Sequence, residues 1–356
     1  MKKRTVVICL SRVNGGMELA SVKLARLLSE DVEVEFIGRS GSFILERPEH
    51  FQGYNIRVHE VAFRSNLSVK LIRSIRKILI EREIKNIIFL GASEMKSLYF
   101  ATLGLDVNFI IRQGSKKTTP KKDFFHKLFY SNVNHFVGNC EFMKQNILDI
   151  LPIPTKANVS RIYASLQLPT EVEYKKYNGH VSIVSVGRVH PGKGQIDVIK
   201  ACSILHENSI AFDVKFLGDI QDKEYFQQMN KFMESLPYKD SIEFVGYTAN
   251  IKKYLQESDV FILPSLGEGM SNAIIEALGY GLIPIIYNDT SSPEFVSLGF
   301  HLYLTDANTV ASLKKDLLYV AQNLEAQKQK AQHNHQRALD VFSPAREKEE
   351  YIQLLV

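Results

Sequence analysis

The sequence has few cysteines and lacks any long apolar run. Its three cysteines, Cys9, Cys140 and Cys202, are far apart, form no C-x-x-C pair and have apolar or small neighbours. We therefore expect reduced thiols that take no part in function, as is usual for proteins of the reducing cytoplasm. No segment approaches the roughly 18 uninterrupted apolar residues of a membrane-spanning helix. Together these absences predict a cytoplasmic protein.

The sequence also lacks the residue spacing of a metal site. It contains no convincing Asp-x-Asp motif, and its ten histidines are scattered. Only His333 and His335 lie close together, on a polar segment that is predicted to be helical, and we expect both to be solvated. We therefore expect no metal ion and no bound cofactor.

The chain of 356 residues is long enough for two or more domains, and its hydrophobic content of 45% allows substantial cores. Strand and helix patterns alternate from end to end, which indicates an α/β architecture with mostly parallel sheets. Prolines interrupt this pattern between Pro152 and Pro169, so we place a domain boundary there. Ser343 and Pro344 have the residue types of an N-cap and a first helical position. The predicted domains are 1–168 and 169–341, followed by a terminal helix at 342–356.

Two carboxylates eight positions apart flank a turn that opens into an apolar helix. The strand predicted at 259–264 is followed by Glu268, Gly269 and the helix start, and Glu276 lies farther along the helix. Unpaired amides at a helix N-terminus, together with the helix dipole, attract a phosphate. One carboxylate can then hold a sugar hydroxyl and the other a ribose. In the alternative interpretation, Glu268 only caps the helix and Glu276 is a solvated helix residue.

A second phosphate-type cluster lies about 80 residues upstream of Glu268. The strand predicted at 182–186 leads into Gly187-Arg188-Val189-His190-Pro191-Gly192-Lys193-Gly194, and an amphipathic run follows at 196–205. Arg188 and Lys193 thus flank a glycine-rich turn between a strand and a helix. Such fixed cations suit a diphosphate, because Arg grips two oxygens and Lys acts as a mobile point charge.

A third candidate lies near the N-terminus. The strand predicted at 5–10 leads through a short loop to Gly15 and Gly16, and an apolar helix follows. A Gly-Gly pair lets the backbone approach a ligand closely. By itself the pair is typical of a turn, and it does not match the dinucleotide fingerprint G-x-G-x-x-G.

Together the three segments resemble the family 4 glycosyltransferases, which are retaining enzymes of the GT-B fold. The resemblance covers most of the chain and is most specific between Glu268 and Pro284. It implies two Rossmann-like domains that face each other across a cleft, with the final helix crossing back to the first domain. The first domain would bind the acceptor, and the second would bind a nucleotide sugar, UDP- or GDP-linked.

The resemblance also implies roles for individual residues. Arg188 and Lys193 would neutralise the donor diphosphate. Glu268 would contact the donor sugar, and Glu276 would hold the ribose. The other expected donor-binding residues are Gly15 and Gly16 of the first domain, Gly269, Met270, Ser271 and Asn272 of the second, and, on a softer match, Tyr247. The acceptor hydroxyl would attack from the face that the diphosphate leaves, which retains the anomeric configuration without a metal or a protein nucleophile.

The sequence departs from the family pattern on the acceptor side. Many relatives have a histidine near the donor sugar, at the end of the fourth strand of the first domain, where this chain has Arg112 and Gln113. We expect one of these two residues to supply a side-chain contact instead. The family's Asn-Gly near the domain junction is replaced by Ile162-Tyr163-Ala164-Ser165.

Charge is divided unevenly along the chain. Residues 1–170 hold 26 Lys and Arg against 15 Asp and Glu, a balance of +11, whereas the remainder has a balance of −6. Part of this excess lies between Arg112 and Tyr130, where lysines and aromatic residues are clustered. This cluster predicts acceptor contacts and peripheral contact with an anionic membrane. The acceptor-binding residues proposed from it are Arg112, Gln113, Lys116 and Lys117.

A second basic segment, 69–85, reads as an amphipathic helix. Such a helix can lie on an anionic membrane, or it can be an ordinary half-buried helix with a solvated charged face. No nucleic-acid partner is expected, because the basic and aromatic residues form no recognised binding module.

The sequence therefore predicts a retaining, metal-independent glycosyltransferase of bacterial surface polysaccharide or lipopolysaccharide synthesis. It would move a sugar from a nucleoside diphosphate sugar to a glycan or lipid-linked acceptor. Two alternatives stay open. A sugar-nucleotide epimerase of the GT-B fold would use the same donor pocket with acid and base residues of its own. A non-catalytic partner subunit would keep the scaffold as a binding module, although the intact set of Arg188, Lys193, Glu268 and Glu276 argues against this.

Overall fold

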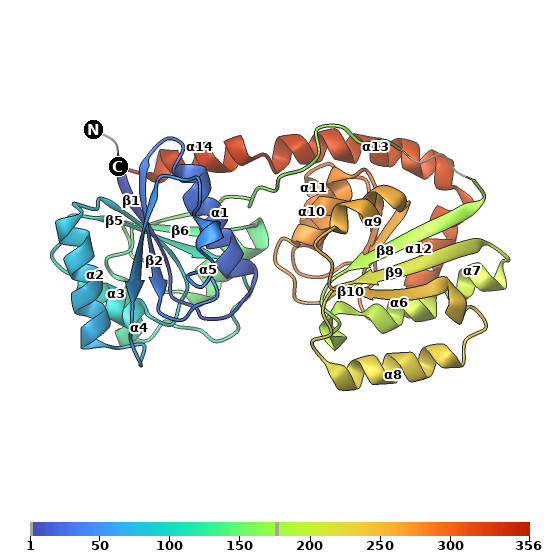
Figure 1. The fold of residues 1–356 in the computed structure, drawn as a ribbon, viewed down its shortest axis with the longest axis horizontal. Helices are drawn as coiled ribbons and strands as arrows, with labels where there is room; N and C mark the ends of the chain where they lie inside the picture. The colour runs from blue at the N-terminus through green and yellow to red at the C-terminus, as the bar shows by residue number, and fades with distance from the viewer. Residues whose placement is uncertain (1–2, 175–177) are drawn as a thin grey trace. The chain divides into compact units, whose positions relative to one another are not determined.

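The computed structural model describes residues 3–174 and 178–356, and residues 1, 2 and 175–177 lie outside the description. It divides into two compact units (Figure 1). Unit 1 consists of Met1–Ala164 and Pro344–Val356, and unit 2 consists of Ser165–Ser343. The boundaries that we predict from the sequence, 168 and 341, fall close to these positions.

Unit 1 is built on a seven-stranded parallel sheet with the order β3-β2-β1-β4-β5-β6-β7. This is the doubly wound order, in which the direction of winding reverses between β1 and β4. Ligands of such sheets bind at that reversal, beyond the carboxyl ends of the strands. The strands are β1 (Arg4–Cys9), β2 (Glu33–Arg39), β3 (Ile56–Val61), β4 (Asn86–Leu90), β5 (Asn108–Gln113), β6 (His135–Gly138) and β7 (Asn158–Arg161).

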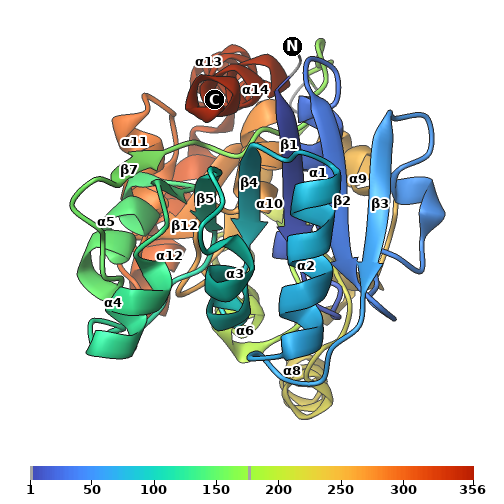
Figure 2. The same cartoon turned by 90° about the vertical axis from the view of Figure 1, so that its left-hand side faces the viewer.

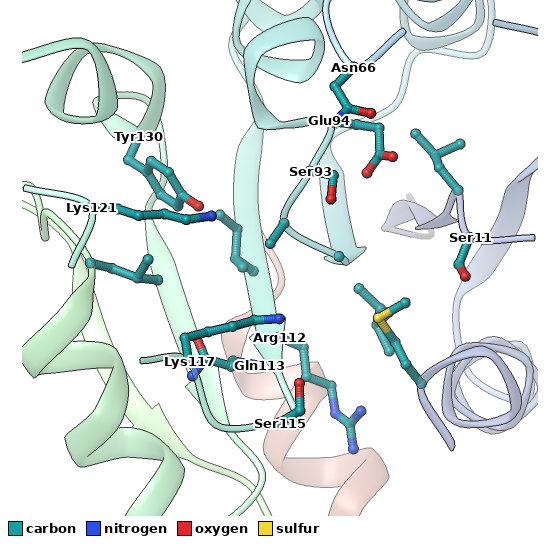
Figure 3. A pocket seen from close by; sticks show the side chains of 18 of the residues that line it. Ser11, Asn66, Ser93, Glu94, Arg112, Gln113, Ser115, Lys117, Lys121 and Tyr130 are labelled. Atoms are coloured by element: carbon teal, nitrogen blue, oxygen red, sulfur yellow. The ribbon is translucent and has the colours of Figure 1, made fainter. Parts of the chain in front are cut away.

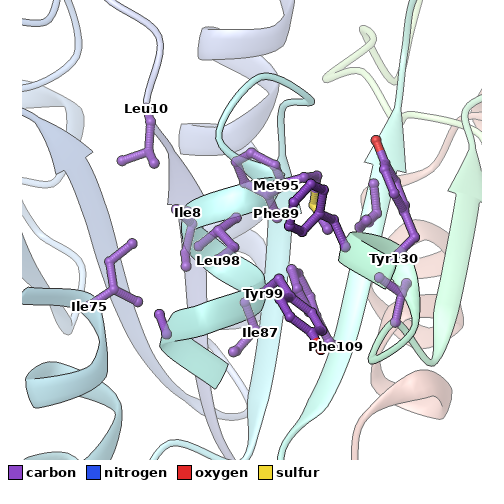
Figure 4. Packing of buried hydrophobic residues seen from close by; sticks show 14 of the residues in the cluster. Ile8, Leu10, Ile75, Ile87, Phe89, Met95, Leu98, Tyr99, Phe109 and Tyr130 are labelled. Carbon is purple, nitrogen blue, oxygen red and sulfur yellow. The ribbon is translucent and has the colours of Figure 1, made fainter. Parts of the chain in front are cut away.

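Helices cover both faces of this sheet, and Figure 2 shows α2 and α3 lying in front of it. Side chains alternate along each strand, so that in β4 Ile87 and Phe89 enter one core while Ile88 and Leu90 enter the other. Figure 4 shows the first of these cores, which α2 to α5 complete. The second core is completed by α1 and α14. The helices of unit 1 are α1 (Gly16–Leu28), α2 (Val69–Glu81), α3 (Met95–Thr102), α4 (Phe124–Tyr130), α5 (Glu141–Ile150) and α14 (Pro344–Leu354), with a short 3-10 turn at Pro48–His50.

The basic helix α2 is a half-buried helix with a solvated charged face, the second of the two interpretations of this segment. Leu71, Ile75 and Leu79 recur every four positions and are buried in the first core. Its two lysines, Lys70 and Lys77, lie at exposed positions.

Helix α14 packs on unit 1, as predicted for the terminal helix. Glu347 is buried, and its carboxylate lies 2.9 Å from the ammonium of Lys23 on α1. Tyr351 and Leu355 enter the core that α1 also lines. A carboxylate that is buried with its counter-ion fixes the position of the helix that carries it.

Unit 2 repeats this architecture with a six-stranded parallel sheet in the order β10-β9-β8-β11-β12-β13. The direction of winding again reverses beside the first strand, between β8 and β11. The strands are β8 (His180–Val186), β9 (Ala211–Leu217), β10 (Ile242–Gly246), β11 (Val260–Leu263), β12 (Ile283–Tyr287) and β13 (Tyr303–Thr305). The helices are α6 (Gln195–Ala201), α7 (Ser203–Glu207), α8 (Lys223–Glu234), α9 (Ile251–Glu257), α10 (Asn272–Gly279), α11 (Ser292–Ser297), α12 (Val310–Gln322) and α13 (Leu324–Val341), with 3-10 turns at Pro191–Lys193 and Lys239–Ser241.

Two sequence-based expectations about polar and thiol side chains meet different outcomes. The three cysteines are buried and form no disulfide, which agrees with the expected reduced thiols. The prediction that His335 is solvated is wrong. Its ring is buried, with one nitrogen 2.6 Å from the carbonyl oxygen of Gly279 and the other 3.2 Å from that of Thr170. Over residues 3–174 and 178–356, no helix is both long and apolar enough to span a bilayer.

Candidate active site

Two loops meet at the carboxyl edge of the sheet in unit 2, where the winding of the sheet reverses. One follows β8 and contains Arg188 and Lys193, and the other follows β11 and leads to α10. The backbone N–H of Leu266 donates to the carbonyl of Gly192 at 3.0 Å, which joins the loops. Gly194 has φ +67°, and a Cβ there would lie 2.3 Å from the carbonyl oxygen of Pro264. Only glycine therefore allows this close approach.

The ammonium of Lys193 forms an ion pair with the carboxylate of Glu268 across these two loops. Both side chains are partly exposed, at 23% and 21%. Arg188 is exposed, and its carbonyl oxygen accepts a 2.9 Å hydrogen bond from the buried side chain of Gln195. Two predicted diphosphate ligands and one predicted sugar ligand are thus brought to one edge of one sheet.

Glu268 does not cap helix α10. The alternative interpretation, in which this residue only caps the helix, is therefore wrong. Helix α10 begins at Asn272, with Ser271 in the N-cap position. Hydrogen bonds to backbone carbonyls fix the loop before this helix. The hydroxyl of Thr290 donates to the carbonyl of Glu268 at 2.6 Å, and that of Ser291 donates to the carbonyl of Gly269 at 2.7 Å. The carboxylate of Glu268 is left to face Lys193.

The backbone amides before α10 form a candidate anion site. The N–H of Gly267 is already used, because it donates to Asp289 at 2.6 Å. The N–H groups of Gly269, Met270 and Ser271 have no acceptor among the residues that the structure describes. Amides of this kind at a helix N-terminus bind phosphate oxygens, and the helix dipole adds to the attraction.

Glu276 lies within α10 and is not a solvated helix residue. It is half-buried, and burial raises the pKa of its carboxyl group, against the opposing effect of the Lys252 ammonium. No hydrogen bond to this carboxyl group is found within the described part of the chain. A carboxylate that is partly shielded from water and receives no hydrogen bond from the protein is suited to accept hydrogen bonds from the hydroxyl groups of a ligand.

The remaining predicted donor residues lie in two places. Tyr247 follows β10 at the same edge of the sheet in unit 2, and its side chain is 74% exposed. Asn272 is exposed at the first position of α10. Gly15 and Gly16 belong to unit 1, at the N-terminus of α1, and a Cβ at Gly16 would meet no atom within 4 Å.

Unit 1 contains a cavity of about 400 Å³ beyond the carboxyl ends of β1, β4 and β5 (Figure 3). Its size lies within the range of small-molecule sites, roughly 300 to 1,000 Å³. Five of the side chains that line it are basic, against one carboxylate. The basic residues are Arg12, Arg39, Arg112, Lys117 and Lys121, and the carboxylate belongs to Glu94. We refer to this cavity as the cationic pocket.

Three of the four predicted acceptor residues line the cationic pocket, and Lys116 does not. The ammonium of Lys116 lies 5.6 Å from the ring centre of Phe142 instead. Gln113 donates to the side-chain oxygen of Asn146 at 2.7 Å, and the same oxygen accepts the N–H of Lys117 at 2.9 Å. Gln113 thus helps to position the loop that carries Lys117.

Arg112 is 7% exposed, and its Nε has no partner among the described residues. Its guanidinium lies beside Tyr351 of α14. Arg112 and Gln113 end β5, so the strand we counted as the fourth of the first domain is the fifth.

The sequence-based prediction missed Ser93, Glu94 and Asn66, which line the same pocket. The signal that could have found Ser93 and Glu94 is their position in the loop after β4, beside the reversal of winding in the sheet. Asn66 lies in the loop between β3 and α2, where no motif marks it.

Part of the chain matches a known protein family. Residues 170–337 match the model of the family described as glycosyl transferases group 1. This segment belongs to the glycosyl transferases group 1. It contains the whole cluster in unit 2, from Arg188 and Lys193 to Glu268 and Glu276.

Similar proteins come from several organisms. The capsular polysaccharide biosynthesis glycosyltransferase CapH of Staphylococcus aureus is 24% identical over 86% of the chain and 88% of CapH. An Escherichia coli protein is 31% identical over 38% of the chain and 35% of its own length, and is named UDP-Gal:alpha-D-GlcNAc-diphosphoundecaprenol alpha-1,3-galactosyltransferase. The chain spans only 40% and 35% of the first curated relatives it matches.

Solved structures resemble the chain over nearly its whole length. The crystal structure of Anabaena HepE in complex with UDP has a TM-score of 0.81 at 14% identity, covering 99% of this chain and 98% of HepE. At this identity the likeness concerns the fold. It confirms the predicted α/β fold with two Rossmann-like units of the GT-B type.

Within residues 3–174 and 178–356, no three His, Cys, Asp or Glu side chains lie close enough together to bind a metal ion.

Proposed function

We propose that this protein transfers a sugar from a nucleoside diphosphate sugar, UDP- or GDP-linked, to a glycan or lipid-linked acceptor. The reaction retains the anomeric configuration and requires no metal ion. It takes place at the cytoplasmic face of the membrane, in the synthesis of surface polysaccharide or lipopolysaccharide. The observation that carries the proposal is the loop of Gly269, Met270 and Ser271, whose backbone amides have no acceptor among the described residues and which follows Glu268, the partner of the Lys193 ammonium.

These groups have the chemistry of a diphosphate site. Backbone amides at the start of α10 donate to phosphate oxygens, and Lys193 and Arg188 add positive charge from the neighbouring loop. The names of two similar proteins support the class of donor, since the Escherichia coli relative is named for UDP-Gal and HepE was crystallised with UDP.

Catalysis would depend on the charge that grows on the β-phosphate as the bond to the sugar breaks. Donors and cations that are fixed before the reaction stabilise this charge without reorganisation. Lys193 would turn from Glu268 to the phosphate, and Glu268 would then accept hydroxyl groups of the donor sugar. Glu276 would accept the ribose hydroxyls farther along α10.

The cationic pocket of unit 1 would bind the acceptor, since it offers basic and hydroxyl-binding side chains in one cavity. Its neighbour α4 bears Phe124 and Phe125, which are 75% and 63% exposed, and Lys127 on the same helix is exposed too. Exposed aromatic side chains among lysines are typical of proteins that bind anionic membranes. We therefore include peripheral membrane contact through α4 in the proposal.

The test begins with donor binding. UDP- and GDP-linked sugars are screened for thermal stabilisation, because a ligand at 100 times its dissociation constant adds about 2.7 kcal/mol to the free energy of unfolding. The selected donor is then incubated with lipid-linked and free glycans, with and without EDTA, and the new bond is characterised by NMR.

We expect transfer with a retained anomeric configuration that persists in EDTA. Isomerisation of the nucleotide sugar without an acceptor would point to an epimerase instead. A chain that binds no nucleotide sugar would be a partner subunit.

A further inference from the structure

The two ends of the cationic pocket differ in chemistry (Figure 3). Ser93, Glu94 and Asn66 lie toward one end, and Lys117 and Lys121 lie toward the other. A ligand that satisfies both ends must itself have two different ends. This asymmetry identifies the class of acceptor.

Glu94 supplies the carboxylate at the first end of the pocket. It is 9% exposed and its carboxylate points into the cavity (Figure 3). No side chain in the described part of the chain donates a hydrogen bond to this carboxylate or forms an ion pair with it. Burial raises the pKa of the carboxyl group, opposed by its own backbone N–H and by the charge of Arg39.

A buried carboxyl group that receives a hydrogen bond only from its own backbone N–H has unused hydrogen-bonding capacity, which a ligand with hydroxyl groups can fill. The hydroxyl of Ser93 and the amide of Asn66 stand beside it and can both donate and accept. Several adjacent hydroxyl groups are the defining feature of a sugar. The first end of the pocket therefore suits a sugar ring.

Lys117 and Lys121 form the second end of the pocket, and neither ammonium is paired with a carboxylate among residues 3–174 and 178–356. Burial lowers the pKa of Lys121, and the charges of Lys117 and Lys96 lower it further. Like charges that are gathered without a counter-ion repel one another. An anion bound between them relieves this repulsion and accepts hydrogen bonds from both ammonium groups.

The loop that carries the two lysines has a fixed backbone. Asn146 accepts from the N–H of Lys117 and donates to its carbonyl, each at 2.9 Å. The N–H of Lys121 donates to the carbonyl of Ile150 at 2.8 Å. The lysine stems therefore start from defined positions at the rim of the pocket, which favours a specific anion site over a diffuse basic surface.

Helix α4 continues from this second end. Lys121 precedes it, and Tyr130 at its last position lines the pocket. Its exposed rings of Phe124 and Phe125 pack against each other with their centres 5.8 Å apart. An apolar chain attached to an anion at Lys121 would meet apolar surface along α4.

We propose that the acceptor is a glycosyl phosphate or diphosphate on a lipid, bound with its sugar at Glu94, its phosphate at Lys117 and Lys121, and its lipid along α4. This rests on the proposed function and assigns an orientation to the acceptor. The sugar hydroxyl that receives the new sugar lies at the Glu94 end, away from the lysines.

The first experiment compares two acceptors that carry the same sugar. One has the sugar on farnesyl diphosphate, and the other has it on an uncharged farnesyl glycoside. We expect the wild type to prefer the diphosphate in kcat/KM by tenfold or more. Lys117→Gln and Lys121→Gln reduce kcat/KM for the diphosphate at least tenfold and leave that for the uncharged acceptor within twofold.

Glu94→Gln lowers kcat/KM for both acceptors, because both carry the sugar. Lys156→Gln is the matched control, since Lys156 is an exposed lysine of unit 1 that does not line the pocket. Equal use of the two acceptors by the wild type would overturn the proposal. So would an equal loss for both acceptors in the lysine variants.

A binding experiment separates this proposal from the proposed function. Farnesyl diphosphate is titrated by calorimetry into a Lys193→Ala background, which weakens the donor site in unit 2. We expect binding that is lost when Lys117→Gln and Lys121→Gln are added and kept when Lys156→Gln is added. Unchanged affinity in the lysine variants refutes the anion site, even if no transferase activity has been found. A loss of affinity for farnesyl diphosphate in the lysine variants supports the anion site, also when no transferase activity has been found.

Discussion

The ammonium of Lys193 pairs with the carboxylate of Glu268, although the two residues lie 75 positions apart in the sequence. The pair connects the loop after β8 to the loop before α10, at the reversal of winding in the sheet of unit 2. Each group is the counter-ion of the other. A diphosphate that binds Lys193 would replace one anion with another and free Glu268 for a neutral sugar.

Lys193→Ala and Arg188→Ala should each slow sugar transfer strongly and leave the fold intact. Each variant removes a cation from a phosphate that gains charge in the transition state. We expect the activation barrier to rise by about 2 to 4 kcal/mol, the range found for lost oxyanion donors. The measurement is kcat/KM with the donor selected by thermal stabilisation. Lys223→Ala, at an exposed position at the start of α8, is the control. Wild-type rates in either folded variant would remove that residue from the site.

Glu276→Gln should weaken binding of the donor and change kcat little. Its carboxylate would accept ribose hydroxyls, and a hydrogen bond to a charged group contributes about 1.5 to 3 kcal/mol. We therefore expect the dissociation constant of the nucleotide sugar to rise about tenfold, or 1.4 kcal/mol. Calorimetry measures this directly, with Glu234→Gln on the exposed end of α8 as the control. An unchanged dissociation constant contradicts the role of Glu276.

Glu94→Gln should stabilise the folded protein at neutral pH while it reduces transfer. Burial raises the pKa of Glu94 in the folded state above its unfolded value, so the folded state binds the proton more tightly. The stability from Glu94 is then complete below the unfolded pKa and is lost as the pH rises through the higher folded pKa. Gln keeps the neutral form at every pH.

Urea unfolding between pH 4 and pH 8 tests the prediction for Glu94. The gain in the free energy of unfolding should be near zero at the acid end and should grow toward neutral pH. A variant that is less stable than the wild type at pH 7 would show that the carboxylate has a partner in the folded state.

Phe124→Ser combined with Phe125→Ser should weaken binding to vesicles that contain phosphatidylglycerol. Burying a Phe side chain contributes roughly 1.5 to 3 kcal/mol, so even partial insertion of two rings should change the partition coefficient tenfold or more. Stability should not change, because both rings are exposed. The control is Tyr319→Ser, an aromatic residue of unit 2 that is 49% exposed.

Salt separates the electrostatic part of this binding from the apolar part. The Debye length falls from about 10 Å at 0.1 M to about 3 Å at 1 M, so salt should release the wild type from anionic vesicles. Replacing Lys116, Lys117, Lys121 and Lys122 with Ser should have the same effect as salt. If the wild type ignores anionic vesicles in low salt, unit 1 does not bind membranes and a soluble acceptor becomes the better hypothesis.

Local patterns in the sequence were sufficient for much of the fold and of the donor cluster. The strands β1, β8 and β11 were predicted to within two residues at each end, because apolar runs bounded by glycine and polar residues determine them. Arg188 and Lys193 stood out because the glycines around them specify a tight turn. Gly194 shows why this works: its positive φ and its contact with Pro264 require that residue type.

Only the tertiary structure decided which charged side chains are buried and which face each other. Lys116 and Lys117 are adjacent, yet Asn146 fixes the backbone so that Lys117 lines the pocket while Lys116 lies near Phe142. His335 looked solvated on a polar segment, but the backbone carbonyls of Gly279 and Thr170 surround it. The physical reason is the range of the interactions. The preference for strand, turn or helix depends on neighbours in the chain, whereas the burial and pairing of a charge depend on groups that only folding brings near.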